Sequence, residues 1–222
     1  MQQALMFVLA LLEDTIVIKP HELGIELGSF LKTQVLRRRI NQRLSNRIVP
    51  QLGLCICVYD LLEVGVTYIL PGEGSGHTRV KFRLVVFRPF VDEVIQARVA
   101  SSSSEGLKLS VEFFEDITIP ADRLPEPHIF EQSEKVWYWE YPSDDGEPPA
   151  RLYMDPGKIV RFRVVENIFR DVKPNPTSDD VQNEKSYEII GTMAETGLGC
   201  VAWWSSSTGD DIADETEDME EE

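Results

Sequence analysis

The stretch Val85–Phe114 joins two runs of alternating apolar and polar residues through the tripeptide Arg88-Pro89-Phe90. Alternation with a period of two is typical of β-strands, because successive side chains of a strand point to opposite faces. Proline interrupts strand pairing here, since it has no backbone N–H group to donate. The pattern predicts two separate sheets, with a seam near Phe87–Asp92 and a first domain of residues 1–88.

The first domain is predicted to be a small α+β unit of one strand, one helix and three further strands. β-Branched residues favour strand structure over Phe7–Leu12 and Thr15–Ile18. Ser29, a residue type that caps helices, begins a run of apolar residues at helical spacing that stops at Pro50. This run predicts an amphipathic helix of about five turns. The later strands are predicted over Leu54–Leu61, Val64–Leu70 and Val80–Phe87.

The predicted helix carries, opposite its apolar residues, the one strongly basic patch in an acidic protein. Arginine-rich faces attract phosphate or acidic protein surfaces, although arginine is also a good helix former that commonly lies in solvent. The patch is therefore either a contact surface or a solvated helix face. Its members are Lys32, Arg37, Arg38, Arg39, Arg43 and Arg47.

A glycine-rich segment, Pro71-Gly72-Glu73-Gly74-Ser75-Gly76, connects the last two predicted strands of this domain. It lacks the Gly-Lys-Ser/Thr ending of a phosphate-binding loop, and its glutamate would repel phosphate. The segment is therefore predicted to be a hairpin tip, where glycines let another backbone approach closely.

Residues 89–204 are predicted to form a small β-barrel of the OB-fold type, because short strands alternate with Gly and Pro turns and no long helix intervenes. The polar segment 173–186 is predicted to be a loop inserted between barrel strands. Residues 205–222 hold nine acids and no base in a chain of net charge −16, which predicts a disordered acidic tail. The predicted barrel strands are Ile95–Val99, Leu107–Val111, Ile117–Ile119, Val136–Tyr141, Ile159–Val165, Tyr187–Met193 and Gly199–Trp204.

Catalysis requires convergent side chains of suitable types, and the sequence has no His-Asp-Ser set, no His/Cys cluster and no phosphate-binding loop. Cys55, Cys57 and Cys200 are predicted to be core residues in a reducing compartment. No stretch has the apolar length of a membrane helix. We expect no catalytic residue, no metal site, no cofactor and no membrane contact.

Four basic residues, Arg98, Lys108, Arg161 and Arg163, alternate with apolar residues and are expected on the outer face of neighbouring barrel strands. They would either follow an RNA backbone or lie in solvent as ordinary surface charge. RNA-binding barrels usually add aromatic side chains on which bases stack, but the strand Leu107–Val111 carries none. Any RNA contact is therefore expected to be weak and electrostatic.

Tryptophans occur in two short runs of the predicted barrel. A buried ring is the usual outcome, yet four such rings are more than a small barrel easily encloses, and tryptophan is favoured at protein interfaces. Some of them are therefore candidates for a partner interface. The residues are Trp137, Trp139, Trp203 and Trp204.

These segments resemble the larger stalk subunit of archaeal and eukaryotic RNA polymerases over nearly the whole chain, to about Trp204. Besides the arginine-rich helix, the resemblance is carried by Phe7-Val8-Leu9, Ile69-Leu70-Pro71-Gly72-Glu73-Gly74, Val85-Val86-Phe87-Arg88-Pro89-Phe90 and Glu93-Val94. The segments most similar to the RNA polymerase III member are Leu109-Ser110-Val111-Glu112-Phe113-Phe114-Glu115-Asp116-Ile117, Pro120-Ala121-Asp122 and Trp137-Tyr138-Trp139-Glu140.

The resemblance implies an RNP-like tip domain that docks on the polymerase core through Pro71–Gly76, and an OB-fold domain that projects near the RNA exit path. It also implies a smaller helical stalk subunit as partner, a nuclear location, and a non-catalytic role in initiating transcription, including tRNA transcription. Initiation factors and nascent RNA are further expected contacts. The alternatives are a free-standing OB-fold RNA-binding factor and the equivalent subunit of another nuclear RNA polymerase.

Overall fold

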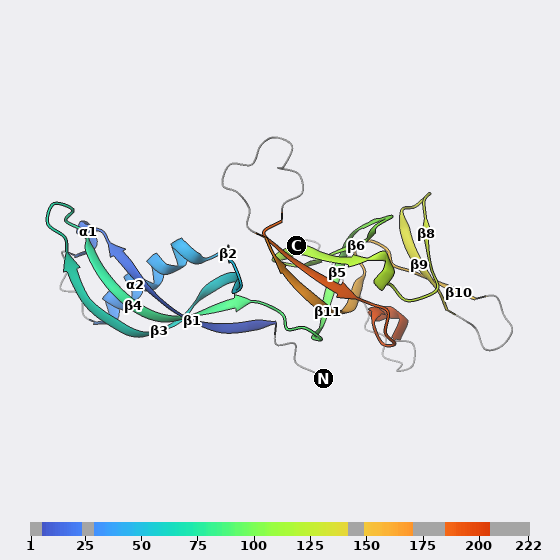
Figure 1. The fold of residues 1–222 in the computed structure, drawn as a ribbon, viewed down its shortest axis with the longest axis horizontal. Coiled ribbons are helices and arrows are strands. Elements are labelled where there is room, and N and C mark those ends of the chain that lie inside the picture. Colours follow the sequence, from blue (N-terminus) through green and yellow to red (C-terminus); the bar gives the residue numbers. More distant parts are fainter. Residues whose placement is uncertain (1–5, 24–28, 142–148, 171–184, 205–222) are drawn as a thin grey trace, which may run out of the picture.

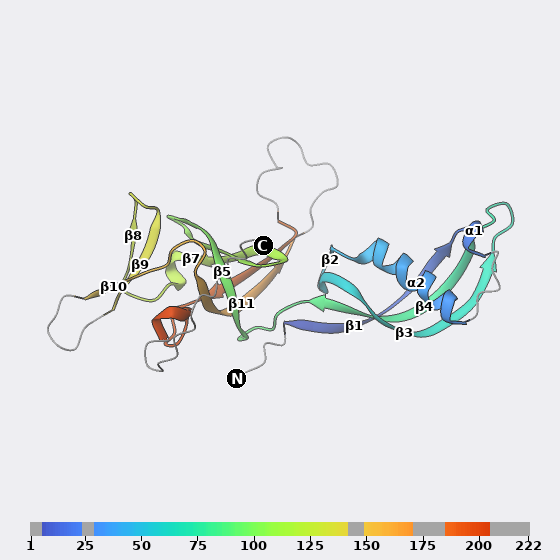
Figure 2. The same cartoon turned by 180° about the vertical axis from the view of Figure 1, so that it is seen from behind.

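The computed structural model describes residues 6–23, 29–141, 149–170 and 185–204. A sheet with one long helix forms one end of an elongated molecule, and a β-barrel with a small attached sheet forms the other (Figure 1, and Figure 2 from behind). The predicted inserted loop and acidic tail, 173–186 and 205–222, fall outside the described residues except for 185 and 186. Within the part described, no helix combines the length and the apolar character that crossing a membrane requires.

The N-terminal sheet is antiparallel throughout and has the strand order β1-β4-β3-β2. Helix α2 covers one face, where its Leu36 and Ile40 are fully buried in one cluster with Phe82 and Leu84 of β4. A spacing of four residues places such side chains on one side of a helix. The predicted α+β class is confirmed. The elements are β1 (Phe7–Ile18), α1 (Pro20–Leu23), α2 (Ser29–Leu44), β2 (Arg47–Val49), β3 (Gly53–Ile69) and β4 (Gly76–Phe87).

The long helix ends earlier than the predicted stop at Pro50, because a β-hairpin begins where the apolar spacing continues. After Leu44, the segment Arg47–Val49 pairs with β3 instead of adding a helical turn. Asn46 has a left-handed backbone conformation (φ 59°), and its N–H donates to the Cys55 carbonyl at 2.8 Å. Asparagine tolerates this conformation better than most residues, so the helix ends where the residue type permits a reversal.

The strands predicted over Leu54–Leu61 and Val64–Leu70 are one continuous strand, β3, of 17 residues. Its pairing with β4 shifts register at several points, one of them between Cys55 and Cys57. Such irregularities disturb the alternation of faces and bend the strand, which is why the sequence pattern looks interrupted. The prediction that the cysteines lie in the core is wrong for Cys57, which is exposed beside the register shift, whereas Cys55 is buried.

Five strands close the C-terminal barrel in the order β5-β6-β7-β12-β11, and β11 returns to β5. Neighbouring strands are antiparallel except β7 and β12, which are parallel. Leu107, Phe162 and Ile189 fill the interior and are fully buried. The predicted OB-fold, a five-stranded Greek-key barrel, is confirmed. Its strands are β5 (Val94–Ser103), β6 (Gly106–Val111), β7 (Phe114–Pro120), β11 (Ile159–Phe169) and β12 (Tyr187–Thr192).

Between β7 and β11 the chain forms a second sheet of order β10-β9-β8, of which only β9 matches a predicted strand. The strand predicted over Gly199–Trp204 shortens to two residues and a 3-10 turn. Gly199 has φ 91°, and the ring of Trp203 occupies the space that a Cβ would need there. These elements are η1 (Ala121–Arg123), β8 (His128–Glu131), β9 (Val136–Tyr141), β10 (Ala150–Tyr153), β13 (Gly199–Cys200) and η2 (Val201–Trp204).

The seam between sheet and barrel is packed. Phe87, the last residue of β4, is fully buried and shares a cluster with Leu54 of β3 and with barrel residues such as Phe114. The Asn167 side chain donates to the Pro89 carbonyl at 2.9 Å, which ties the connecting segment to β11. The two parts of the molecule therefore share buried apolar residues instead of being joined only by a linker.

Candidate docking and RNA-contact surfaces

The open face of the N-terminal sheet, opposite α2, is crossed by a belt of ion pairs. The central strand β4 supplies three cations, and each meets a carboxylate on a neighbouring strand. A hydrogen bond from Arg83 lowers the pKa of Asp60, and the hydrogen bond to Glu63 raises the pKa of Lys81. Exposed pairs of this kind add little stability, but they keep the middle of the face polar. The ion-pair belt consists of Arg79 with Glu13, Lys81 with Glu63 and Arg83 with Asp60.

On the barrel side of this belt, β1 exposes apolar side chains. Leu11 lies opposite Arg83 in the strand pairing, and Leu9 and Phe7 follow at alternate positions of the same face. The Phe7 ring lies 5.8 Å, between centroids, from that of Phe113 in the β6–β7 turn, so the apolar surface continues onto the barrel. The apolar strip consists of Phe7, Leu9, Leu11 and Phe113, which are 44%, 46%, 64% and 44% exposed.

On the other side of the belt lies the turn between β3 and β4. It holds the residues expected to dock on a polymerase core, Pro71, Gly72, Glu73, Gly74, Ser75 and Gly76, of which the first four are exposed. Gly72 and Gly74 have φ angles of 89° and 70°, which glycine adopts without strain. The exposed apolar residues Tyr68, Ile69 and Leu70 lead into the turn. We call Pro71–Gly76 the tip loop, and the three exposed apolar residues before it, Tyr68, Ile69 and Leu70, its apolar shoulder.

The residues predicted to contact RNA all lie on the outside of the barrel: Arg98 on β5, Lys108 on β6, and Arg161 and Arg163 on β11. Their charges are not equally available. Arg163 donates to the Glu195 carboxylate at 2.7 Å, which neutralises it locally. Arg98 donates to a backbone carbonyl at 3.1 Å and keeps its charge. Within the described residues, neither Lys108 nor Arg161 takes part in an ion pair.

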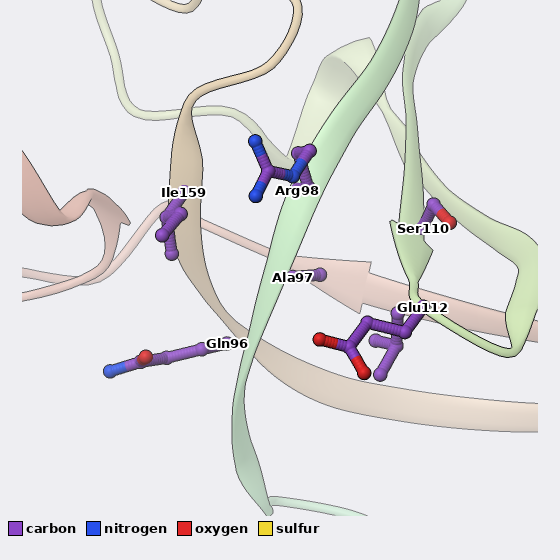
Figure 3. A pocket seen from close by; sticks show the side chains of 7 residues that line it. Gln96, Ala97, Arg98, Ser110, Glu112 and Ile159 are labelled. Atoms are coloured by element: carbon purple, nitrogen blue, oxygen red, sulfur yellow. The ribbon is translucent and has the colours of Figure 1, made fainter. Parts of the chain in front are cut away.

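A groove of about 420 Å³ opens on the same face, beside Arg98 (Figure 3). Strand pairing sets Arg98 opposite Ile159 on one side and Ser110 on the other. Figure 3 shows the Glu112 carboxylate turned toward β5, yet no ion pair joins it to Arg98 within the described residues. A cation and a carboxylate therefore line one groove without neutralising each other. The lining residues are Gln96, Ala97, Arg98, Ser110, Val111, Glu112 and Ile159.

The four tryptophans have different surroundings. Trp137 is buried and its Nε1–H donates to the Ser103 carbonyl at 2.8 Å, so it belongs to the barrel core. Trp139 and Trp203 are half-buried, with ring centroids 5.6 Å apart. Trp204 is also half-buried and donates to a backbone carbonyl at 3.0 Å. The structure thus brings the two tryptophan-containing segments together through Trp139 and Trp203. The rings of Trp139, Trp203 and Trp204 remain partly exposed where the small sheet meets η2.

Three of the six residues of the predicted basic patch, all three on α2, are engaged within their own domain. They hold the helix to its surroundings and have little remaining capacity for other ligands. Arg38 of α2 and Arg47 of β2 remain exposed, so a contact surface on this patch would centre on them. The internal contacts are Arg37 with the carbonyls of Val58 and Tyr59, Arg39 with Glu22, and Arg43 with Asp14.

Sequence reasoning missed the apolar strip, although one signal was present. A strand with one covered face should alternate, but Phe7–Leu12 is apolar at every position. Such a run indicates that both faces of the strand are suited to burial. For metal ions, the described part of the chain holds no cluster of three or more His, Cys, Asp or Glu side chains suited to coordination.

Known proteins are similar to this chain over most of its length. Residues 93–204 match the family described as RNA polymerase III subunit Rpc25, and residues 13–74 match the SHS2 domain found in the N terminus of Rpb7p/Rpc25p/MJ0397. DNA-directed RNA polymerase III subunit RPC8 of Bos taurus is 38% identical over 91% of this chain and 100% of its own length. The subunit of that name from Schizosaccharomyces pombe is 34% identical over 90% and 100%. RNA polymerase II subunit RPB7 of Saccharomyces cerevisiae is 32% identical over 48% and 60%.

Proposed function

This chain belongs to the family of RNA polymerase III subunit Rpc25, and from that premise we propose that it is the larger subunit of the RNA polymerase III stalk. The observation that carries the proposal is similarity over 91% of this chain to a subunit named for RNA polymerase III. The polymerase II subunit matches only 48%. The polymerase III assignment is therefore better supported than the equivalent subunit of another polymerase.

Its role is to bind and position rather than to catalyse, in the nucleus and during initiation of transcription, including that of tRNA genes. RNA synthesis belongs to other subunits of the enzyme. The exposed apolar and basic surfaces support this role, because such surfaces mark sites of association.

The tip loop and its apolar shoulder are the proposed contact with the polymerase core. Glycines at positive φ, such as Gly72 and Gly74, present backbone without a Cβ in the way. Tyr68, Ile69 and Leu70 add exposed apolar area beside them. A buried core of apolar contacts with a polar rim is the usual anatomy of a stable interface, and the ion-pair belt supplies a polar border on one side.

The smaller helical stalk subunit is the proposed occupant of the apolar strip. Phe7, Leu9 and Leu11 form a row on a sheet face that no element of this chain covers among the described residues. Phe113 extends the row across the seam, so a partner seated here would contact both domains. The half-buried Trp139 and Trp203 offer a second, smaller surface for a partner or an initiation factor.

Weak contact with nascent RNA is proposed for the outer barrel face. On this face, Lys108 and Arg161 form no ion pair among the described residues. Arg98, which donates only to a backbone carbonyl, adds a third positive charge. Phosphate contacts of this kind give affinity with little sequence preference.

An affinity purification from cells tests the assignment. The tagged full-length chain should bring down RNA polymerase III core subunits together with one small helical subunit. A variant with the segment Gly72–Gly76 replaced by a shorter turn should retain the small subunit and lose the core. Recovery of RNA without polymerase subunits would favour a free-standing RNA-binding factor, and full recovery of the polymerase by the shortened variant would contradict the docking role of the tip loop.

A further inference from the structure

The groove beside Arg98 has the chemistry to read the edge of one nucleobase, and we propose that it is a guanine-selective subsite within the RNA-contact face. The inference rests on the proposed RNA contact and adds a base preference to it. Its basis is the pair formed by Arg98 and Glu112, a guanidinium and a carboxylate that line one groove without an ion pair between them in the described part of the chain.

Guanine is the base whose hydrogen-bonding groups complement such a pair most fully. Its O6 and N7 atoms accept two hydrogen bonds from an arginine fork, the commonest base-specific contact of proteins. Its N1–H and N2–H groups donate to a carboxylate, which has acceptors only. Adenine offers a single amino group and no carbonyl, uracil offers one N–H, and cytosine satisfies the carboxylate with its N4 amino group alone.

The strands hold the two charged groups in a suitable frame. Gln96 and Arg98 project from the same face of β5, about 7 Å apart. Ser110 of β6 lies opposite Arg98, and Glu112 follows two residues later, in the turn just after that strand ends at Val111. In Figure 3 the Glu112 carboxylate turns toward β5, whereas the Arg98 guanidinium and the Gln96 amide turn to the Ile159 side of that strand. A base would therefore meet Arg98 and Glu112 together once the exposed Arg98 side chain swings away from the Gly157 carbonyl to which it donates.

The remaining walls suit a base held by its edge rather than by its face. Ala97, Val111 and Ile159 supply apolar contact but no ring for stacking. The volume of about 420 Å³ lies within the range of small-molecule sites, which is ample for one base. The missing aromatic side chains, which weaken the barrel as a stacking platform, therefore do not prevent recognition of this kind.

Basic residues flank the groove where the RNA backbone would pass. Arg161 lies opposite Gln96 across the β5–β11 pairing. Lys108 lies two residues before Ser110 on β6, toward the other end of the groove. Phosphates on either side of an inserted guanosine would thus meet Arg161 and Lys108, and the electrostatic contact would place the base over the groove.

Binding of fluorescently labelled oligouridylates tests the subsite. The full-length chain, in the complex with which it purifies, is titrated with strands that carry one central guanosine, adenosine, cytidine or inosine. The guanosine strand should bind at least about fivefold more tightly than the adenosine strand, as expected for one good bidentate pair. Inosine lacks the N2 amino group, so its strand should fall between the two.

Two glutamate variants assign the preference to the groove. Glu112→Gln should bring the guanosine and adenosine affinities within a factor of about two. Glu115→Gln makes the same change of charge at an exposed position of β7 outside the groove and should keep the preference. Neither side chain is buried, so the fold is preserved in both.

The possible failures are distinguishable. Equal affinity of the native chain for all strands, or a guanosine preference that survives Glu112→Gln, would overturn the subsite while the electrostatic RNA contact stands. Absence of any salt-sensitive RNA binding would overturn both the subsite and the RNA contact on which it rests.

Discussion

The rings of Phe87 and Phe113 meet edge to face, with centroids 5.0 Å apart and planes at 88°. Phe87 ends the last strand of the N-terminal sheet, and Phe113 lies in a turn of the barrel, so this contact crosses the seam. Phe7 approaches both rings, at 5.9 and 5.8 Å between centroids. The same aromatic cluster that fastens the two parts together therefore also begins the apolar strip, where we propose that a partner binds.

Phe87→Ala should destabilise the chain far more than Phe113→Ala. Phe87 is fully buried and its truncation leaves a cavity, which typically costs about 3–5 kcal/mol. Phe113 is 44% exposed, so its truncation removes less buried apolar area. Thermal unfolding of the two variants, each in the complex with which it purifies, compares them. Equal melting temperatures would show that the seam does not depend on Phe87.

Leu9→Ser combined with Leu11→Ser should weaken binding of the smaller stalk subunit and leave stability nearly unchanged. Leu9 is 46% and Leu11 64% exposed, and surface changes of this kind usually alter stability by no more than about 0.5 kcal/mol. Val17→Ser, on the same face of β1 but beyond the ion-pair belt, is the matched control. Release of the partner by the control as well would mean that the belt does not separate two docking surfaces.

Glu188 should contribute an acid-sensitive part of barrel stability. Burial alone would raise its pKa, but hydrogen bonds from Thr118 and Arg170, each 2.9 Å long, outweigh burial and lower the pKa below 4.5. Since the folded pKa is lower than the unfolded one, this stabilisation is complete above about pH 4.5 and is lost as the pH falls through the folded value.

Glu188→Gln tests this linkage. The substitution should cost about 1–2 kcal/mol at neutral pH, because hydrogen bonds to a charged group are weakened. It should also flatten the decline of the melting temperature in acid, measured from neutral pH downward. Glu115→Gln, at an exposed site on β7, should preserve that decline. If the melting temperature of Glu188→Gln declined in acid as steeply as that of the native chain, other carboxyl groups would account for the decline.

RNA binding should depend on salt through two residues above all. Lys108→Ala with Arg161→Ala should lower the slope of log affinity against log salt by about 0.7 for each phosphate of a single strand that the protein no longer neutralises. Arg163→Ala should have a smaller effect, because Arg163 is already bonded to Glu195. Fluorescence anisotropy across a salt series measures both. If the double variant kept the native slope, the charges on this face would be solvated and the RNA would bind elsewhere.

The barrel could be predicted because period-two alternation in its strands reflects a local rule, one face inward and one face outward. The strands β8 and β10 could not, since His128–Glu131 and Ala150–Tyr153 are short and gain their pairing only from β9. The tip loop was likewise predictable from its glycines, which mark a turn wherever they cluster.

The sequence could not predict which basic residues on the barrel face form ion pairs and which do not. Arg163 and Arg161 are indistinguishable in the sequence, two residues apart in one alternating strand. Only folding brings Glu195, from a distant part of the sequence, next to Arg163. The two cysteines diverge for a similar reason, because a register shift between Cys55 and Cys57 is set by pairing with β4.

The shared cluster at the seam has a consequence for biosynthesis. Every pairing of the N-terminal sheet lies within residues 7–87, so this sheet can form while later residues are still being translated. Leu54 and Phe87 then remain exposed to solvent until the barrel residues that pack against them have been translated. The barrel itself closes last, because β12 pairs with both β7 and β11 and ends only at Thr192. The nascent chain thus exposes part of this apolar cluster until residue 192 has been translated, a period in which a chaperone would protect it from aggregation.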